Sequence, residues 1–176
     1  MQDMGIGERG VVVASVFFLD ASQPQNERES RYRDPDARLA AIPGVVSIAE
    51  TYTTPMGGNT SDTGIEVDHR HVGDAYINQV GPGYFKTVGT PFVVGRDFDQ
   101  RDVKGAALVA IVTQAFSTAF LKRAGVGARF TVPDERAGIG TDFEVIGVVG
   151  NQKYLDVHES QPKIFFTPSA QDRDPL

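Results

Sequence analysis

The chain has 176 residues, of which 40% are apolar and 23% charged, a composition that predicts a globular protein with a buried core. Its formal charge is −6 and no segment gathers a run of Lys and Arg, which argues against a nucleic-acid or anionic-lipid surface. The absence of cysteine excludes disulfides and thiolate metal sites. The longest apolar run, VVVASVFFL, is too short for a spanning helix, which needs roughly 20 residues.

The first third of the chain carries the pattern of a β-α-β unit. Residues 11–19 are β-branched and aromatic, which predicts a buried strand. Asp34 followed by Pro35 is typical of a helix start, so we expect a helix over 35–42. The alternating residues 45–54 predict a second strand.

The segment PMGGNTSDTG, residues 55–64, is rich in turn-forming residues and predicts a loop that separates two lobes. Two half-buried strands follow, IEVDHRHV and DAYINQV, and Gly73-Asp74 between them predicts a hairpin turn. A short helix is expected over 82–88, and then an apolar segment that closes on Gly95.

The last third alternates strands with one helix. Residues 107–112 predict a strand, and Thr113 is the expected cap of a helix over 114–123 that Gly125 ends. Phe116 and Phe120 form the apolar stripe of this helix and should lie in the core. Further strands are predicted at ARFTV, FEVIGVV and KIFFTP, so the fold class is α+β.

Glycine-rich stretches raise the question of a phosphate site, and their spacing answers it. In VGPGYFKTVGTPFVVGRDFDQRD, residues 80–102, Lys86 does not follow a glycine directly, and position 86 would have to be glycine for a dinucleotide loop. GVVG at 147–150 lacks the third glycine and the small-residue helix start. Both stretches therefore predict structural turns and no bound cofactor. Gly83 and Gly95 each stand beside bulky residues at a change of pattern, so we expect at least one of them to have a positive φ.

Catalytic and metal sites are equally hard to find in the sequence. His69 and His71 would share one strand face, but Asp68 would point to the other, which favours a solvated face over a metal site. No G-x-S-x-G motif is present. Acid–base chemistry would require carboxylates such as Asp97 and Asp102 to meet in a pocket, whereas Asp97 is better explained as a cap or a partner of Arg96. We expect no catalytic residue, no metal and no enzyme activity.

Several motifs in fixed order resemble one family. They are PGYF at 82–85, GRDF at 95–98, VTQAF at 112–116, GVVG at 147–150 and PKIFFTP at 162–168. Together they resemble the extracytoplasmic (periplasmic core) domain of MacB-type, FtsX-like ABC transporter permeases, and in particular the duplicated permeases of soil bacteria.

The resemblance implies two lobes and a set of structural residues. Residues 9–54 would form part of a porter-like β-α-β lobe, 55–168 a mixed α/β insert of the sabre type, and 169–176 a tail. A second β-α-β unit is expected after the tail, so the chain would be a piece of a larger domain. The implied structural motif consists of Gly81, Gly83, Tyr84, Phe85, Gly95, Arg96, Phe98, Phe116, Gly147, Gly150 and Pro168.

The resemblance also implies a function. The chain would be a non-catalytic domain, anchored on the extracytoplasmic side of the bacterial inner membrane, that transmits ATP-driven conformational change to substrate or partner proteins. Its partners would be the transmembrane helices of the permease, a cytoplasmic ATPase subunit or domain, and a periplasmic adaptor. The alternative is a small-ligand or peptide binding domain that uses the cleft between the lobes. Apolar residues 11–19, if uncovered, would cause self-association.

Overall fold

The computed structural model describes residues 10–15, 37–55, 57, 60–122, 125–134, 140–154 and 161–171. Its strands are β1 (Ser61–Val67), β2 (Arg70–Val80), β3 (Phe92–Gly95), β4 (Val109–Thr113), β5 (Arg129–Val132), β6 (Thr141–Val149) and β7 (Ile164–Pro168). The helices within this part are α2 (Tyr84–Val88) and α3 (Gln114–Phe120), with a further helical turn at 37–40. The α+β class expected from the sequence is confirmed.

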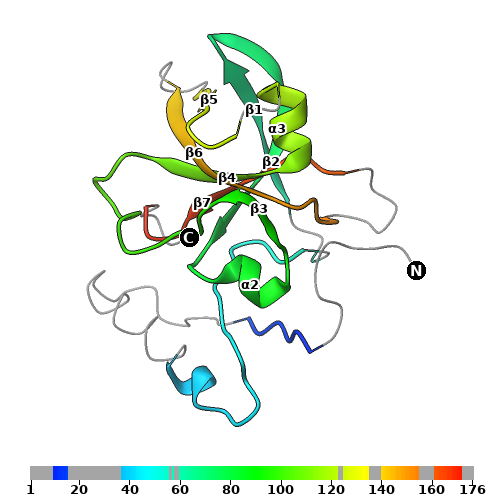
Figure 1. The fold of residues 1–176 in the computed structure, drawn as a ribbon, viewed down its shortest axis with the longest axis vertical. Helices are drawn as coiled ribbons and strands as arrows, with labels where there is room; N and C mark the ends of the chain where they lie inside the picture. The colour runs from blue at the N-terminus through cyan, green and yellow to red at the C-terminus, as the bar shows by residue number, and fades with distance from the viewer. Residues whose placement is uncertain are drawn as a thin grey trace.

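The strands form one strongly curved sheet in the order β3-β6-β4-β7-β2-β1-β5 (Figure 1). The long strand β6 closes it: its first half pairs with β5 and its second half with β3, while β4 runs along its other edge. Strands β4 and β6 are parallel, as are β2 and β7, and the other pairs are antiparallel. Closure leaves β3 as the strand with a single neighbour in the described sheet.

Alternation along the strands divides the core between two faces of the sheet, which we call the α3 face and the α2 face. In β4, Ala110 and Val112 belong to the α3 face, whereas Val109 and Ile111 belong to the α2 face. The buried α3 face comprises Ile65, Ala75, Ala110, Val112, Phe116, Phe120, Leu121, Phe130, Val145, Val148 and Phe165. The buried α2 face comprises Val80, Tyr84, Phe85, Phe98, Val109, Ile111, Ile146, Val149, Tyr154, Ile164 and Phe166.

Helix α3 begins as predicted and ends earlier. The Thr113 hydroxyl accepts a hydrogen bond from the Phe116 N–H at 3.3 Å, and Phe116 and Phe120 are buried, so the predicted cap and core face are confirmed. The prediction that the helix reaches 123 is wrong, because the last helical residue is Phe120 and Lys122 has a φ of 52°. A left-handed residue cannot continue the helical hydrogen-bond ladder, and lysine gives no local sign that it will adopt this conformation.

The hairpin formed by β1 and β2 turns at a different place from the one predicted. Asp68 and His69, with φ of 52° and 60°, occupy the two turn positions, where Asp and His tolerate positive φ better than most residues. Gly73 instead lies inside β2 at an irregularity in the register, with a φ of 136°. A Cβ there would lie 3.0 Å from the Phe120 ring, so the glycine allows α3 to approach the strand.

The predicted loop over 55–64 is also shorter than expected. Residues 61–64 form the first half of β1 and pair with residues 74–77 of β2. Their turn-forming composition is overridden because β2 offers an unpaired edge along its whole length.

The strands predicted in the first third are not found. Residues 11–15 and 45–50 are not in a strand, and within 45–54 the single bridge joins Thr51 to Val80. A period of two produces a strand only when a neighbouring backbone pairs with it, and among the described residues the backbone of the sheet reaches 45–50 only at Glu50, whose carbonyl accepts from the Gly81 N–H. Residues 16–19 lie outside the described part. Residues 37–48 extend away from the sheet in Figure 1, and their predicted helix is seen at 37–40.

Candidate functional site

The residues of the expected structural motif gather around α2, with the exception of Phe116 on the α3 face. Their shared feature is a position on or beside the strand ends that meet α2: Gly81, Gly83, Tyr84, Phe85, Gly95, Arg96, Phe98, Gly147, Gly150 and Pro168. The site is therefore built from the α2 face of the sheet and the chain segments attached to it.

Gly83 starts α2 in a conformation that other residues adopt at a cost. It is the N-cap residue with a φ of 80°, and its N–H donates to Asp97 Oδ2 at 3.1 Å. The second oxygen of Asp97 accepts from the Phe98 N–H at 2.8 Å. Asp97 is thus a cap, as one of the two sequence readings had it, and it links the helix start to the segment after β3.

Gly95 makes the closest backbone approach in the site. Its φ is 91°, and a Cβ would lie 2.6 Å from the Gly147 Cα on β6. A Cβ on Gly147 would in turn lie 2.8 Å from the Arg96 carbonyl oxygen. The two glycines therefore let β3 and β6 touch where the chain turns into the Arg96 corner, and the predicted positive φ is confirmed for both Gly83 and Gly95.

Arg96 organises the corner that follows. Its guanidinium donates to both oxygens of Asp102, at 2.6 and 2.8 Å, and more weakly to Asp99 at 3.3 Å. Asp102 is 3% exposed whereas the Arg96 side chain is 34% exposed, so a buried carboxylate anchors a half-buried guanidinium at the corner. The carboxylate partner of Arg96 is thus Asp102 and not Asp97, whose backbone carbonyl accepts from Arg96 instead. The reason is geometric: Asp97 already faces Gly83.

The two carboxylates respond to this environment in opposite directions. Burial raises the pKa of Asp97, against the lowering effect of its two backbone N–H donors. Burial alone would also raise the pKa of Asp102, but the hydrogen bonds from Arg96 and from the Asp99 N–H outweigh it, so the Asp102 pKa is lowered. Both side chains are occupied by structural donors, which leaves neither arranged as a general acid or base.

An incoming segment, residues 49–53, is attached to the end of β2. Tyr52 donates its N–H to the Gln79 carbonyl and Gly81 donates to the Glu50 carbonyl, both at 2.9 Å. These bonds flank the bridge between Thr51 and Val80. The pattern is that of a non-hydrogen-bonded antiparallel pair, in which the two residues face each other closely.

Asn78 reinforces this attachment from the α2 face. It is 1% exposed, its Oδ1 accepts from the Thr53 N–H at 2.9 Å, and its Nδ2 donates to the Thr53 carbonyl at 2.8 Å. The same amide donates to the Thr51 hydroxyl at 3.1 Å. The side chain thereby satisfies the backbone of Thr53 as a neighbouring strand would.

An outgoing segment, residues 168–171, leaves from the opposite edge of β2. Ser169 donates its N–H to the Val80 carbonyl at 3.0 Å, directly after the parallel pairing of β2 and β7. Gln171 then donates through Nε2 to the Ala107 carbonyl at 2.8 Å and accepts from the Val109 N–H at 3.2 Å. Since successive residues of a strand bond to opposite edges, the end of β2 lies between the incoming and outgoing segments.

Two tyrosines complete the buried surface beneath the incoming segment. Tyr84 lies beside Thr51, and Tyr154 lies beside Thr53. Burial raises the pKa of both phenols, that of Tyr154 to about 12, so both stay neutral at physiological pH. Two residues before Tyr154, the buried Gln152 amide has no hydrogen-bond partner among the described residues.

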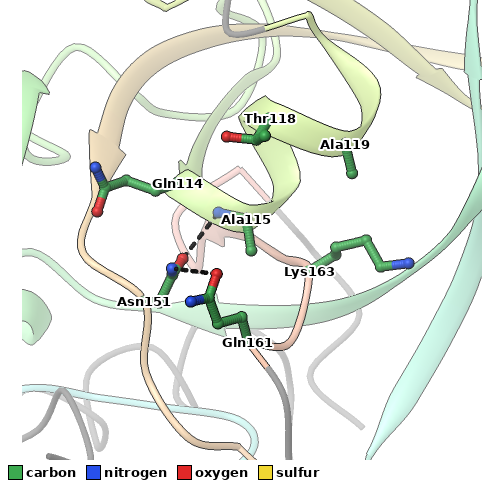
Figure 2. Close-up of a pocket in the computed structure, with 7 residues that line it drawn as sticks. All are labelled: Gln114, Ala115, Thr118, Ala119, Asn151, Gln161 and Lys163. Carbon is green, nitrogen blue, oxygen red and sulfur yellow. Dashed lines mark hydrogen bonds between the residues drawn. The ribbon is translucent and has the colours of Figure 1, made fainter.

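A separate groove of about 460 Å³ lies between α3 and the residues around β7 (Figure 2). The Asn151 side chain links the two sides of the groove: it accepts from the Ala115 N–H at 2.8 Å and donates to the Gln161 side chain at 3.2 Å. The lining consists of amides, small side chains and one lysine: Gln114, Ala115, Thr118, Ala119, Asn151, Gln161 and Lys163. Among the described residues, the lining contains no carboxylate or histidine, and its one charged side chain is that of Lys163.

The described part of the chain has neither a metal-binding cluster nor a membrane-spanning helix. No group of three or more His, Asp or Glu side chains is placed to hold a metal there. His69 occupies the hairpin turn and His71 lies in β2, exposed and 3.9 Å from Asp74, so the expected shared face does not exist. The helices within the same residues are too short and too polar to span a membrane.

Sequence reasoning missed Asn78, Gln171 and Thr53. Asn78 gave one signal that was overlooked, since it is an amide between Tyr76 and Val80 in a row of α2-face residues. A polar residue at an inward strand position requires a partner. Gln171 gave no such signal, because its partners are 62 residues away in the chain.

Fold and site together define a mixed α/β domain in which close glycine contacts and buried polar side chains hold chain segments against one sheet. Over residues 5–173 the chain matches the MacB-like periplasmic core domain family, and it belongs to that family. Comparison with curated proteins finds no relative that matches it.

Solved structures agree with this assignment. The chain is similar to the periplasmic region of MacB from Actinobacillus actinomycetemcomitans, with a TM-score of 0.54, 18% identity, and coverage of 84% of this chain and 62% of that one. It is also similar to the extracellular domain of the noncanonic ABC-type transporter YknZ from Gram-positive bacteria, with a TM-score of 0.51, 15% identity, and coverage of 77% and 60%. The chain thus spans about three fifths of these solved domains. Family and fold indicate a periplasmic domain of an ABC-type transporter permease.

Proposed function

We propose that the chain is a non-catalytic extracytoplasmic domain that transmits ATP-driven conformational change from a permease to substrate or partner proteins. The observation that carries the proposal is the attachment of the lobe. Its incoming segment bonds to Gln79 and Gly81, and its outgoing segment bonds to Val80, on opposite edges of one strand end. Neighbouring strands are about 4.8 Å apart, so the two segments are roughly 10 Å apart. A lobe with adjacent ends is suited to insertion into a larger moving body.

The same proposal covers location and partners. The domain would be anchored to the inner membrane by the transmembrane helices of its permease and driven by a cytoplasmic ATPase subunit or domain. A periplasmic adaptor is a further proposed partner. Two lobes are proposed as well, with the first around residues 9–54 and the second containing the sheet. Family membership supports these proposals, and the relation to duplicated permeases of soil bacteria stays a prediction.

The proposal is tested in the permease that contains the chain, reconstituted with its ATPase. A cysteine at Val93, which is 54% exposed on β3, takes a spin label without competition from the rest of this chain, which has no cysteine. The distance from this label to one on a transmembrane helix should change when ATP and vanadate are added. An unchanged distance would contradict the proposal, as would hydrolysis of ATP by the purified chain alone.

A second candidate function is the binding of a small ligand or peptide. It was expected at a cleft between lobes, whereas the groove in Figure 2 lies within one lobe, beside Asn151 and Lys163. The amide-rich lining favours a polar ligand. Thermal-shift screening tests this function, since a ligand at a hundred times its Kd stabilises the chain by about 2.7 kcal/mol. A screen in which no ligand raises the unfolding temperature would contradict the binding function and leave conformational transmission as the proposed function.

Self-association of the chain is proposed from its first apolar run. Val12 and Val13 are 88% and 59% exposed, and apolar surface of this kind recruits a partner. Light scattering at micromolar concentration should therefore detect a dimer or larger species. A monomer throughout this range would contradict self-association.

A further inference from the structure

We propose that Asn78 and Gln171 are positioning residues. Their side-chain amides, which we call clips, hold the incoming and outgoing segments against the sheet, so that the lobe moves together with the segments that enter and leave it. This inference rests on the proposed function, because it says which side chains would carry the transmitted movement. It assigns a role to two residues that neither the family motifs nor the sequence reasoning singled out.

The two clips share one chemical design. In each, a single side-chain amide both donates to a backbone carbonyl and accepts from a backbone N–H. Asn78 does so with the carbonyl and N–H of Thr53, at 2.8 and 2.9 Å. Gln171 does so with the Ala107 carbonyl and the Val109 N–H, at 2.8 and 3.2 Å. Both clips imitate the two bonds that a paired strand residue makes.

Both clips lie next to the backbone pairing of their segments and not within it, so side chains make the bonds that a further strand would make. Backbone pairing of the incoming segment ends at Thr51 and Tyr52, and pairing of β7 with β2 ends at Val80. The Asn78 clip holds Thr53, which follows the paired residues Thr51 and Tyr52 on the side toward β1, and the Gln171 clip lies two residues after Ser169. Each therefore extends the hold on its segment beyond the backbone pairing without adding a strand to the sheet.

Burial makes the first clip the firmer one. Asn78 and Thr53 are both buried, with 1% and 5% exposed. Replacing the Asn78 amide would therefore leave the buried N–H and carbonyl of Thr53 without these hydrogen bonds. Gln171 is half-buried and its clip is partly open to water. A direct bond from Ser169 Oγ to Glu50 Oε2, at 3.4 Å, joins the two segments next to the clips.

The clips also relocate the expected hinge. The sequence placed a lobe boundary at 54–55, yet residues 50–53 are bonded to the sheet on the lobe side. The preceding residues differ sharply: Gly44 has a φ of 93°, and Val46 is 93% exposed. Bending between the lobe and its support should therefore occur within 44–48, outside the clips.

Hydrogen exchange on the 176-residue chain tests each clip by itself. In Asn78→Leu the Thr53 amide, and in Gln171→Met the Val109 amide, should exchange about tenfold faster, because each loses its acceptor. The buried Val112 amide should keep its rate, and Gln100→Met, at an exposed turn, is the matched control. Gln171→Met keeps the test open if Asn78→Leu does not fold.

Two results of this experiment would overturn the inference. One is an unchanged exchange rate at Thr53 or Val109 in the matching variant. The other is an equal rise at Val112, which would mean that the variants loosen the whole lobe rather than one attachment.

A covalent rescue separates positioning from mere stability. Thr51 and Val80 form a non-hydrogen-bonded pair, for which the Cα separation of about 4.5 Å suits a disulfide. In the reconstituted permease, Asn78→Leu should broaden the distribution of label distances from Val93 that ATP shifts. Thr51→Cys with Val80→Cys, oxidised to the disulfide before the Val93 label is attached through a thioether, should narrow this distribution, and reduction of the disulfide should broaden it again.

The outcomes distinguish this inference from the proposed function. If ATP moves the label in the native permease but the disulfide restores nothing, the clips are not positioning residues and the proposed function stands. If ATP does not move the label at all, the proposed function fails, and the exchange rates at Thr53 and Val109 still decide whether the clips hold their segments.

Discussion

The α3 face and the α2 face of the same sheet are built in opposite ways. On the α3 face the ring of Phe116 lies 5.0 Å from those of Phe120 and Phe130 and 6.0 Å from that of Phe165, and the hydrophobic cluster of this face contains no tyrosine. The α2 face contains tyrosines and adjoins the buried amide of Asn78.

The difference shows that one sheet can use one face to stabilise the lobe and the other face to hold the segments attached to it. Aromatic packing on the α3 face stabilises the lobe but gives no directional bond to other parts of the chain. Polar groups on the α2 side form hydrogen bonds, whose strength depends on distance and angle, so they determine where the incoming segment and the Arg96 corner are held. Changes on the two faces should therefore have different consequences.

The largest effect is expected on the α3 face. Phe116 is fully buried, so Phe116→Ala should lower the free energy of unfolding by about 3–5 kcal/mol, through lost burial and the cavity left behind. Urea denaturation measures the change. Val93→Ala, on the exposed side of β3, is the control and should change it by less than about 0.5 kcal/mol. A similar loss in both variants would remove the distinction between the core face and the surface.

The next effect concerns the close approach of β3 and β6. Gly95→Ala should cost about 1–2 kcal/mol for the positive φ, and the contact of the new Cβ with the backbone of β6 should add about 1–3 kcal/mol. Gly105→Ala has a similar φ of 88° but open space around it, so it should show the first cost alone. Equal thermal stability of the two variants would mean that the close approach is unimportant.

A smaller effect is expected at the Arg96 corner. Arg96→Ala leaves the buried Asp102 carboxylate without its two donors and should cost about 1–3 kcal/mol. The control is Arg129→Ala, which breaks an exposed pair with Glu144 at 3.2 Å and should cost less than about 1 kcal/mol. Chemical denaturation in low and high salt compares them. If Arg129→Ala proves the more costly change, the corner is not an anchor.

The smallest effect is a dependence on pH confined to the α2 side. The folded-state pKa of Asp102 lies below its ordinary 3.8, so its contribution to stability is present above that value and is lost as the pH falls through the folded-state pKa. The folded-state pKa of Asp97 lies above 3.8, so its contribution is present below that value and is lost as the pH rises through the folded-state pKa.

These opposite signs can be measured with two variants. The stability difference between the native chain and Asp102→Asn should grow with rising pH, whereas the difference for Asp97→Asn should shrink. Thermal unfolding between pH 3 and 7 follows both. Slopes of the same sign would show that the two carboxylates do not experience different surroundings.

The sequence by itself determined the local elements. It predicted a short helix after Pro82, the strands β4 to β7, the start of α3 with its Thr113 cap, a positive φ at one or both of Gly83 and Gly95, and the burial of Phe116 and Phe120. Each rests on signals within a few residues: a period of two or 3.6, a capping hydroxyl, or a glycine beside bulky neighbours. Such signals act on the local backbone without any contribution from residues far away in the sequence.

Tertiary structure decided what depends on a partner far along the chain. It moved the hairpin turn to Asp68 and His69, extended β1 into a predicted loop, and left 45–50 without a strand. It also joined Asn78 to Thr53 across 25 residues and Gln171 to Val109 across 62. A local pattern cannot report such bonds, because an unpaired strand edge or a buried amide acquires its role only when the other segment is in place.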